Sequence, residues 1–386
     1  MQKKIIALAV AGLASTAAFA QSNVTVYGVV DYGYAYRTDA ITPALGVSKP
    51  SSSSQINGGQ QSGNRLGFKG VEDLGNGLKA VFQLEAGFLL DTGRDHAAGS
   101  MFSRQAYAGL TGGFGTLIGG RLYTPHYSFV SSVDPFGNGT VGQYSNTYGG
   151  GLFDPVRVNN AVAYVSPSFG GLTITGAYSN SADTANAGTT NLAGTTIPSG
   201  QDSLTSNAQN NSVYAILARY NGAGIDLGLN YHYIAAGSNG VPTIGGLDTV
   251  KSVQNITLGG SYDAKVVKIA GWYSNSIQDN ATGFSDVKID NWMIGATVPV
   301  GKFAIKASYN LSDGNSAAGG NAQQYAIGTD YSLSKRTNLY TAYAMIDNDS
   351  ATNNRVTTRR ATVVGDGSNG GGTFQTGFNV GLRHQF

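Results

Sequence analysis

Hydrophobic and polar residues alternate with a period of two along most of this chain. From Leu78 to Phe88 the even-numbered residues are apolar, while the odd-numbered ones are Lys, Val, Gln, Glu and Gly. The segments Ile225–Tyr233 and Phe374–Phe386 repeat the pattern. Alternation over about ten residues is typical of a strand between lipid and water, whereas strands of soluble proteins are usually about 5–6 residues long. The pattern therefore favours a membrane β-barrel over a soluble sheet.

The same alternation predicts sixteen strands along the chain. They cover residues 24–36, 64–71, 77–87, 103–111, 115–121, 157–166, 170–179, 211–221, 224–234, 252–262, 265–276, 286–297, 301–311, 322–332, 335–346 and 374–386. Two of them alternate poorly. In the strand 286–297 the alternation shifts by one residue near Asp290, which predicts a β-bulge. The segment Tyr340–Met345 is nearly apolar on both of its faces.

Connections between the predicted strands alternate strictly between short and long. Gly222–Ala223 is one of the short ones, and residues 122–156 and 180–210 are among the long ones. Loops of that length are uncommon inside compact soluble domains, but outer-membrane barrels have long outer loops and tight periplasmic turns. An even number of strands brings both termini to the periplasmic end. Sixteen strands also enclose an aqueous lumen rather than a core filled by side chains.

The first twenty residues have the features of a secretory signal peptide. Lys3 and Lys4 precede an apolar run from Ile5 to Ala14, and Ala18-Phe19-Ala20 has the small-x-small form of a cleavage site. We expect residues 1–20 to be the signal peptide and residues 21–386 to form a single barrel domain. The mature protein would then lie beyond the inner membrane.

Composition agrees with a barrel and excludes several other classes. The chain has 386 residues, 56 glycines, no cysteine and 12% charged residues, against about 25% charged in average soluble domains. The absent cysteine excludes disulfide scaffolds and thiolate metal sites, and the four histidines are widely scattered, so we expect no metal and no cofactor. Without the two leader lysines, 22 Lys and Arg balance 22 Asp and Glu, so no basic field exists to bind nucleic acid. The 22 tyrosines and 15 phenylalanines suit the aromatic girdles of a membrane barrel.

Several motifs resemble one known family. The segment Asn64–Glu85, which begins Asn-Arg-Leu-Gly-Phe-Lys-Gly, is similar to the strand–turn–strand signature of Gram-negative general porins, especially the neisserial and burkholderial branch. Phe102-Ser-Arg-Gln, Gly112-Gly-Phe-Gly-Thr, Arg157-Val-Asn-Asn and the terminal Gly381–Phe386 match that family in the same order. The resemblance extends over essentially the whole mature chain.

This resemblance implies a homotrimer of sixteen-stranded barrels in the outer membrane of a Gram-negative bacterium. In the family a long third loop, here about Leu122–Val156, folds into the lumen and faces an arginine ladder. By motif the ladder maps to Arg65, Arg104 and Arg157, and the only loop acids, Asp134 and Asp154, would be the facing carboxylates. The loop lacks a glutamate that other branches carry, which leaves the position of the negative wall open.

The resemblance also implies several partners. They are the outer-membrane lipid and lipopolysaccharide, the barrel assembly machinery, and the ions and small hydrophilic solutes that pass through. The terminal Phe386 resembles the residue that the assembly machinery reads.

Parity along the strands gives an independent argument for the charged residues. Arg65 and Lys69 share the face opposite Leu66 and Phe68. A charge on the lipid face would cost about 2–4 kcal/mol at the midplane, so we expect both to face the lumen. The other residues predicted to line the pore are Asp31, Lys79, Glu85, Arg121 and Lys306. The prediction that Arg104 faces the lumen is the least clear, because alternation puts Arg104 on the same face as Ala106, Ala108 and Leu110.

More cations than carboxylates are expected on the inner face. The inward cations are Arg65, Lys69, Lys79, Arg104, Arg157, Lys306 and Arg383, and the inward acids are Asp31, Glu85, Asp226 and Asp330. Rings of charged side chains tune ion selectivity, so this excess predicts a mild preference for anions.

Enzymatic motifs are lacking. Gly137–Gly142 matches a dinucleotide fingerprint only by letters, because no βαβ unit surrounds it, and no nucleophile elbow, zinc-protease motif or phosphate loop occurs. We therefore expect no enzyme and no catalytic residues, but a water-filled channel for passive diffusion of ions and small hydrophilic solutes. Two alternatives stay open: a channel selective for one substrate, and a secreted β adhesin without a pore.

Overall fold

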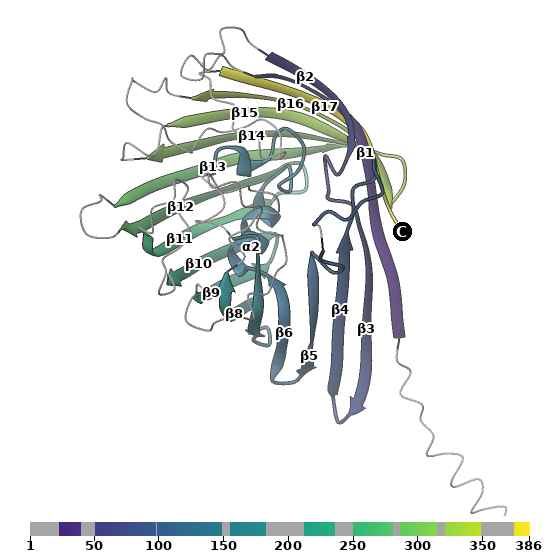
Figure 1. The fold of residues 1–386 in the computed structure, drawn as a ribbon, viewed down its shortest axis with the longest axis vertical. Helices are drawn as coiled ribbons and strands as arrows, with labels where there is room; N and C mark the ends of the chain where they lie inside the picture. Colours follow the sequence, from purple (N-terminus) through teal and green to yellow (C-terminus); the bar gives the residue numbers. More distant parts are fainter. Residues whose placement is uncertain are drawn as a thin grey trace, which may run out of the picture.

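The computed structural model describes residues 23–39, 51–97, 99–148, 155–182, 212–235, 250–280, 286–314, 321–348 and 374–386. Within these ranges the chain forms seventeen strands in a single antiparallel sheet, together with one α-helix and a short 3-10 helix (Figure 1). The predicted signal peptide and Asp154 lie outside the described residues. Among the described helices, none is both long and apolar enough to cross a membrane.

The strands follow one another around the sheet in chain order. They are β1 (Asn23–Asp39), β2 (Ser51–Gly58), β3 (Arg65–Gly75), β4 (Leu78–Gly87), β5 (Gln105–Gly112), β6 (Gly115–Tyr123), β7 (Arg157–Val165), β8 (Leu172–Ala182), β9 (Ser212–Gly222), β10 (Ile225–Ala235), β11 (Val250–Asp263), β12 (Lys268–Asn280), β13 (Val287–Val300), β14 (Phe303–Gly314), β15 (Ala322–Ser332), β16 (Thr337–Asn348) and β17 (Phe374–Gln385).

The sheet closes into a barrel at its first strand. On one side β1 pairs with β17, from Val29 opposite Gln385 to Thr38 opposite Thr376. On the other side its first half pairs with β3 and its second half with β2. Because β2 and β3 together occupy one position around the barrel, the described strands fill sixteen positions. The predicted closed sixteen-stranded antiparallel barrel is therefore confirmed.

Two details of the strand prediction are wrong. Strand β2 lies in the connection expected between the predicted strands 24–36 and 64–71. Its serine repeat has no alternation, and it forms a strand because it pairs with β1. The predicted bulge near Asp290 is absent from β13, which pairs there with β12 and β14 without a shift in register. Alternation fails at that point because buried apolar side chains, Ile289 and Met293, face inward beside polar Asn291.

The two faces of the barrel wall differ in burial and in chemistry. In β1, Asp31 and Arg37 are buried on one face, while Tyr32, Tyr34 and Tyr36 are exposed on the other. Since the strand alternates in a closed barrel, the exposed tyrosines face outward, and a lipid environment favours amphipathic rings at its interfaces. The buried polar residues face the lumen.

The predicted alternation of connections is confirmed at the short-turn end. Strands β9 and β10 are joined by two residues, Ala223 and Gly224, and β3 and β4 are joined by Asn76 and Gly77. The start of β1 and the C-terminal Phe386 lie at this end, because the backbone amides and carbonyls of Gly28 and Phe386 pair with each other. The longer connection between β4 and β5, described except for residue 98, joins the other ends of these strands.

The connection between β6 and β7 contains the α-helix, α2 (Pro125–Val133). Thr124 caps its start by accepting a hydrogen bond from the Tyr127 amide (3.1 Å), and Pro125 occupies the first turn, where a missing N–H costs nothing. Helix α2 packs against β9 to β12. The ring of Phe129 lies against Gly228 of β10, where any Cβ would overlap it.

Candidate functional site

Two of the predicted ladder arginines converge on one tyrosine. Arg104 Nη2 and Arg157 Nη2 both donate to the Tyr123 hydroxyl, at 2.7 and 2.8 Å. The Arg157 guanidinium also lies 4.6 Å from the centroid of the same ring. Tyr123 also contacts helix α2, because the ring of Tyr127 stacks on it with ring centroids 5.2 Å apart. We call Arg65, Arg104, Arg157 and Tyr123 the arginine cluster.

Arg65 joins this cluster through the chain just before β3. Its Nε donates to the Gly63 carbonyl (3.1 Å) and its Nη2 to the Ser62 hydroxyl (2.6 Å). The Arg104 guanidinium lies against the same Gly63. The three arginines predicted from sequence motifs are therefore neighbours, although they come from different parts of the wall.

Glu85 of β4 supplies a carboxylate that pairs with the arginine cluster. Its Oε1 lies 2.8 Å from Arg104 Nε, and its Oε2 accepts from the Tyr27 hydroxyl at 2.9 Å. Both members of the ion pair are buried. Arg104 reaches Glu85 despite its unfavourable parity because β5 begins only at Gln105, so strand alternation does not apply to it.

His96, in the connection between β4 and β5, lies close enough to these arginines for their charge to affect its pKa. Burial and the neighbouring Arg104 and Arg157 lower the pKa of His96 below its ordinary value of 6.5. A neutral imidazole is expected at pH 7, because a further cation would be repelled by the arginines.

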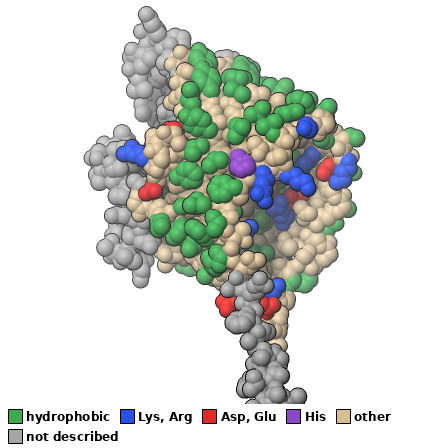
Figure 2. Space-filling model, turned by 90° about the vertical axis from the view of Figure 1, so that its right-hand side faces the viewer, with side chains coloured by type: hydrophobic (Ala, Val, Ile, Leu, Met, Phe, Trp, Pro, Cys, Tyr) green, Lys and Arg blue, Asp and Glu red, His purple; other side chains and the backbone are tan. Residues whose placement is uncertain are grey.

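Of the other residues predicted to line the pore, four contact neighbouring groups and Lys79 is exposed. Lys69 lies 5.2 Å from the centroid of the Tyr27 ring, and Lys306 Nζ lies 2.6 Å from Asp330 Oδ2. Arg121 donates to the Ser103 carbonyl at 2.8 Å, Lys79 is exposed, and Asp31 is fully buried. Figure 2 shows one face of the molecule on which Lys and Arg side chains gather beside a hollow, with hydrophobic side chains over much of the rest.

One ion pair of the inner wall escaped the sequence analysis. Arg219 of β9 donates to Asp226 of β10 through Nε (2.7 Å) and to Ser132 of helix α2 (3.0 Å). Its guanidinium lies 5.6 Å from the Phe129 ring. Val213 and Leu217 share its face, so β9 has apolar residues on both sides, and its pattern predicted the strand but not that Arg219 faces inward.

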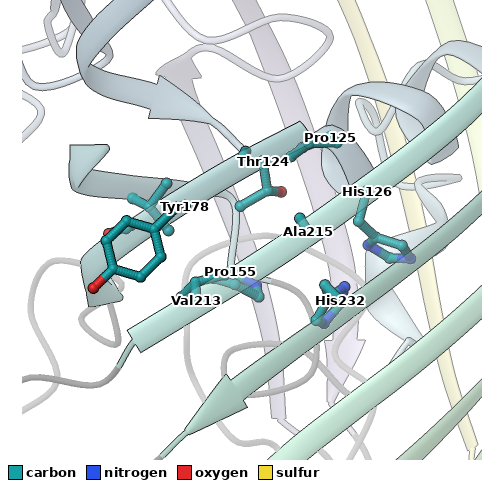
Figure 3. A pocket seen from close by; sticks show the side chains of 11 residues that line it. Thr124, Pro125, His126, Pro155, Tyr178, Val213, Ala215 and His232 are labelled. Atoms are coloured by element: carbon teal, nitrogen blue, oxygen red, sulfur yellow. The ribbon is translucent and has the colours of Figure 1, made fainter. Parts of the chain in front are cut away.

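The start of the β6–β7 connection and its residue Tyr148 bind β11 and β12 through polar side chains. His126 Nε2 lies 3.0 Å from Thr257 Oγ1, and the Tyr148 hydroxyl lies 3.0 Å from Ser274 Oγ. Asn255 donates to the same hydroxyl at 2.9 Å. Figure 3 shows His126 beside His232 of β10, and their ring centroids are 5.2 Å apart. These wall residues lie on the face opposite the exposed outer side chains.

The middle of the connection, residues 136–146, packs on β15 and β16. Asn146 Nδ2 donates to Gln324 Oε1 (2.9 Å), and Gln324 Nε2 donates to the Gly142 carbonyl (3.0 Å). Phe136 and Val141 form an apolar cluster with the small inner side chains of these strands: Ala322, Ala326, Ala342, Ala344 and, larger, Ile346. This cover explains why Tyr340–Met345 is apolar on both faces.

Asp134, one of the two predicted facing carboxylates, is buried at the end of helix α2. It accepts hydrogen bonds from the backbone amides of Phe136 (3.0 Å), Asn138 (2.9 Å) and Tyr144 (3.3 Å). Burial raises the pKa of Asp134 to about 6. In this position the carboxylate holds the turn of its own loop. Whether it also faces the arginines stays a prediction, and the same holds for Asp154.

The described residues bring no three His, Asp or Glu side chains together in a way that could hold a metal ion. The terminal Phe386 is half exposed beside Gly28, and its predicted role in assembly stays a prediction.

A closed membrane barrel with charged side chains on its inner face defines a channel protein of the outer membrane. The sequence profile of the Gram-negative porin family matches residues 7–351, and the chain belongs to this family. It is 34% identical to outer membrane porin protein 32 of Delftia acidovorans, over the full length of both chains.

Solved structures have the same fold. The chain resembles an anion-selective porin from Comamonas acidovorans with a TM-score of 0.74 and 29% identity, covering 95% of this chain and all of that one. It resembles the trimer form of an outer membrane protein of Vibrio cholerae with a TM-score of 0.65 and 16% identity, over 95% of this chain and 99% of the other. The resemblance to Gram-negative porins found in the sequence motifs is thereby confirmed.

Proposed function

We propose that this porin is a passive channel with a preference for small anions. The observation that carries the preference is the ion-pair pattern of the inner wall. Arg104, Arg219 and Lys306 each pair with a carboxylate, whereas Arg65 and Arg157 form no ion pair within the described residues. The unpaired guanidinium groups of Arg65 and Arg157 thus keep the arginine cluster net positive, and charged side chains lining a pore set the sign of the ions that pass.

The β6–β7 connection is proposed to narrow the lumen opposite this charge. Its contacts support that role, since every partner on β10, β11, β12 and β15 lies on the face opposite the exposed outer residues. The Tyr123–Tyr127 stack joins the connection to the arginine cluster. Arg65, Arg104 and Arg157 would form one side of the constriction. Asp134 contributes by holding the loop turn, and Asp154 is proposed to face the arginines.

Assembly and partners follow from the family. We propose a homotrimer, in line with the trimer form of the Vibrio cholerae protein. Outer-membrane lipid and lipopolysaccharide would contact the exposed tyrosines and aliphatic residues, and Phe386 would guide barrel assembly. No catalytic step is included, because the relatives are porins rather than enzymes.

The test is the reversal potential of single channels in a KCl gradient across a planar bilayer. The wild-type protein should give an anion-selective sign, and the double variant Arg65→Ala, Arg157→Ala should shift it toward cations. Lys335→Ala removes a positive charge from the exposed β15–β16 turn and should leave the potential nearly unchanged. A cation-selective wild type, or equal shifts in both variants, would refute the proposed charge preference.

A further inference from the structure

One barrel position is interrupted at residues 59–64, between β2 and β3, and the chain there contacts the inner wall. We infer that this segment, which we call the inner bridge, is a second element that narrows the pore and positions Arg65, with Asp31 as its anchor. The inference rests on the proposed channel function. It adds a determinant of pore width and charge that does not belong to the β6–β7 connection.

Asp31 of β1 fixes the inner bridge through hydrogen bonds to its backbone. Its Oδ2 accepts from the backbone amides of Gln61 (2.7 Å) and Ser62 (2.6 Å), and its Oδ1 accepts from the Tyr340 hydroxyl (2.6 Å). The Asp31 amide in turn donates to Asn64 Oδ1 at 2.6 Å. Hydrogen bonds to an ionised carboxylate are stronger than neutral ones, and this carboxylate has no exposed surface. The anchor therefore replaces the strand pairing that the bridge lacks.

Gln61 extends the bridge across the lumen face to the last strands. Its Nε2 donates to Asp330 Oδ1 of β15 (2.8 Å), and its Oε1 accepts from Asn338 Nδ2 of β16 (2.9 Å). Asp330 also pairs with Lys306 of β14. The bridge thus links the inner faces of β1, β14, β15 and β16 through side chains that would otherwise face water.

The bridge also meets the tip of the β6–β7 connection. The Thr140 amide donates to the Gln60 carbonyl at 2.5 Å. Gly139 is required beside it, because a Cβ at that position would overlap the Gln61 backbone. The loop tip and the inner bridge are therefore in direct backbone contact, and displacement of one would free the other.

On its opposite end the bridge supports the arginine cluster. Ser62 and Gly63 supply both hydrogen-bond acceptors of Arg65, and Gly63 lies against Arg104. The guanidinium of a long, flexible arginine side chain keeps one position only if the groups that accept its hydrogen bonds are themselves fixed. Asp31 consequently acts as a positioning residue for Arg65, through the bridge and without touching the arginine.

The first experiment compares two variants that weaken the bridge with one that does not. Asp31→Asn removes the charge from the anchor, and Gln61→Ala removes the link to β15 and β16. Single-channel conductance should rise by roughly 1.5-fold in each, because a pore widens when a constricting element is released. Anion preference should fall as Arg65 loses its acceptors. Gln278→Ala removes a glutamine of β12 that donates to Asn280 and does not contact the bridge, so its conductance should match the wild type.

The second experiment keeps the inference testable if Asp31→Asn fails to fold. The natural chain has no cysteine, so Ser62→Cys creates a single reactive thiol. An anionic methanethiosulfonate reagent attached there should reduce the chloride current by about half or more, because it places bulk and negative charge beside Arg65. Ser54→Cys lies on the outward face of β2 beside Tyr34. Once mass spectrometry shows that its labelling is complete, the current should be unchanged.

The outcomes separate the two proposals. A conducting wild type whose current is unchanged in Gln61→Ala and after full labelling of Ser62→Cys overturns the inner bridge and leaves the channel intact. A wild type without any conductance overturns the proposed function, and the inference falls with it.

Discussion

Two regions of the barrel wall face inward in different ways. Around β3 to β5 the inner side chains are charged or hydrogen-bonding, as in Arg65, Lys69 and Glu85, and the alternation of the sequence is clear. Around β13 and β16 the inner side chains include Ile289, Met293 and small alanines, and alternation is weak. The difference lies in what covers each wall. The β6–β7 connection lies on the second wall, while polar side chains line the first.

This contrast teaches that inner polarity follows the local neighbour, not the barrel as a whole. A side chain that meets water must be polar, whereas one covered by another part of the chain is stabilised by apolar contact. Substitutions on the covered wall should therefore change stability, and those in the arginine cluster should change selectivity.

The largest effect is expected from Tyr144→Ala, in the part of the β6–β7 connection that packs against the wall at Trp272 of β12. Tyr144 has no exposed surface and meets the edges of Trp272 and Tyr148, at centroid distances of 5.6 and 5.7 Å. Removing a buried aromatic ring should lower the free energy of opening the loop by about 3–5 kcal/mol. Hydrogen exchange of the Tyr148 amide, which donates to the Tyr144 carbonyl, measures this.

The matched control is Tyr343→Ala, since Tyr343 is exposed on the outer face. Its effect on loop opening should be negligible. Equal losses in the two variants would contradict the view that the connection is held by the covered wall.

A smaller effect is expected from pH at Asp134. The folded pKa of about 6 lies above the ordinary value of 3.8, so the folded loop binds the proton more tightly than the open one. This contribution to loop stability is fully present below about pH 4 and is lost as pH rises through 6, a change of about 3 kcal/mol at most. Hydrogen exchange of the Phe136 and Asn138 amides between pH 4 and 8 measures it.

Asp134→Asn should remove this pH dependence, because the amide does not titrate. Stability that rises between pH 4 and 6 in the wild type but not in the variant would reverse the sign and contradict the prediction.

The smallest effect on stability is expected from Arg157→Gln in the arginine cluster. Arg157 is half-buried and loses one hydrogen bond and one cation–π contact, worth about 0.5–1 kcal/mol. Its reversal potential should nevertheless move toward cations. Arg157→Lys keeps the charge and should retain the anion preference. A large loss of stability without a shift in potential would show that the two walls do not differ as described.

Much of the barrel could be predicted from sequence because alternation is a local property. Whether a residue faces lipid depends on its own position in the alternation. The motifs around Arg65, Arg104 and Arg157 resemble those of porins, and that resemblance singled out three arginines that are neighbours in the structure; their role at a constriction stays a prediction. Strand positions, the order of short and long connections, and the inward direction of Lys306 follow from the same rule.

Tertiary structure alone decided the contacts inside the barrel. Arg104 pairs with Glu85 because it precedes a strand, Arg219 lies on an apolar strand, and β2 depends on its partner β1. The Asp31–Tyr340 hydrogen bond joins residues 309 positions apart. Such contacts arise only once the barrel closes, because closure brings the first and last strands together. The pattern of neighbouring residues in the sequence does not predict which distant residues then meet.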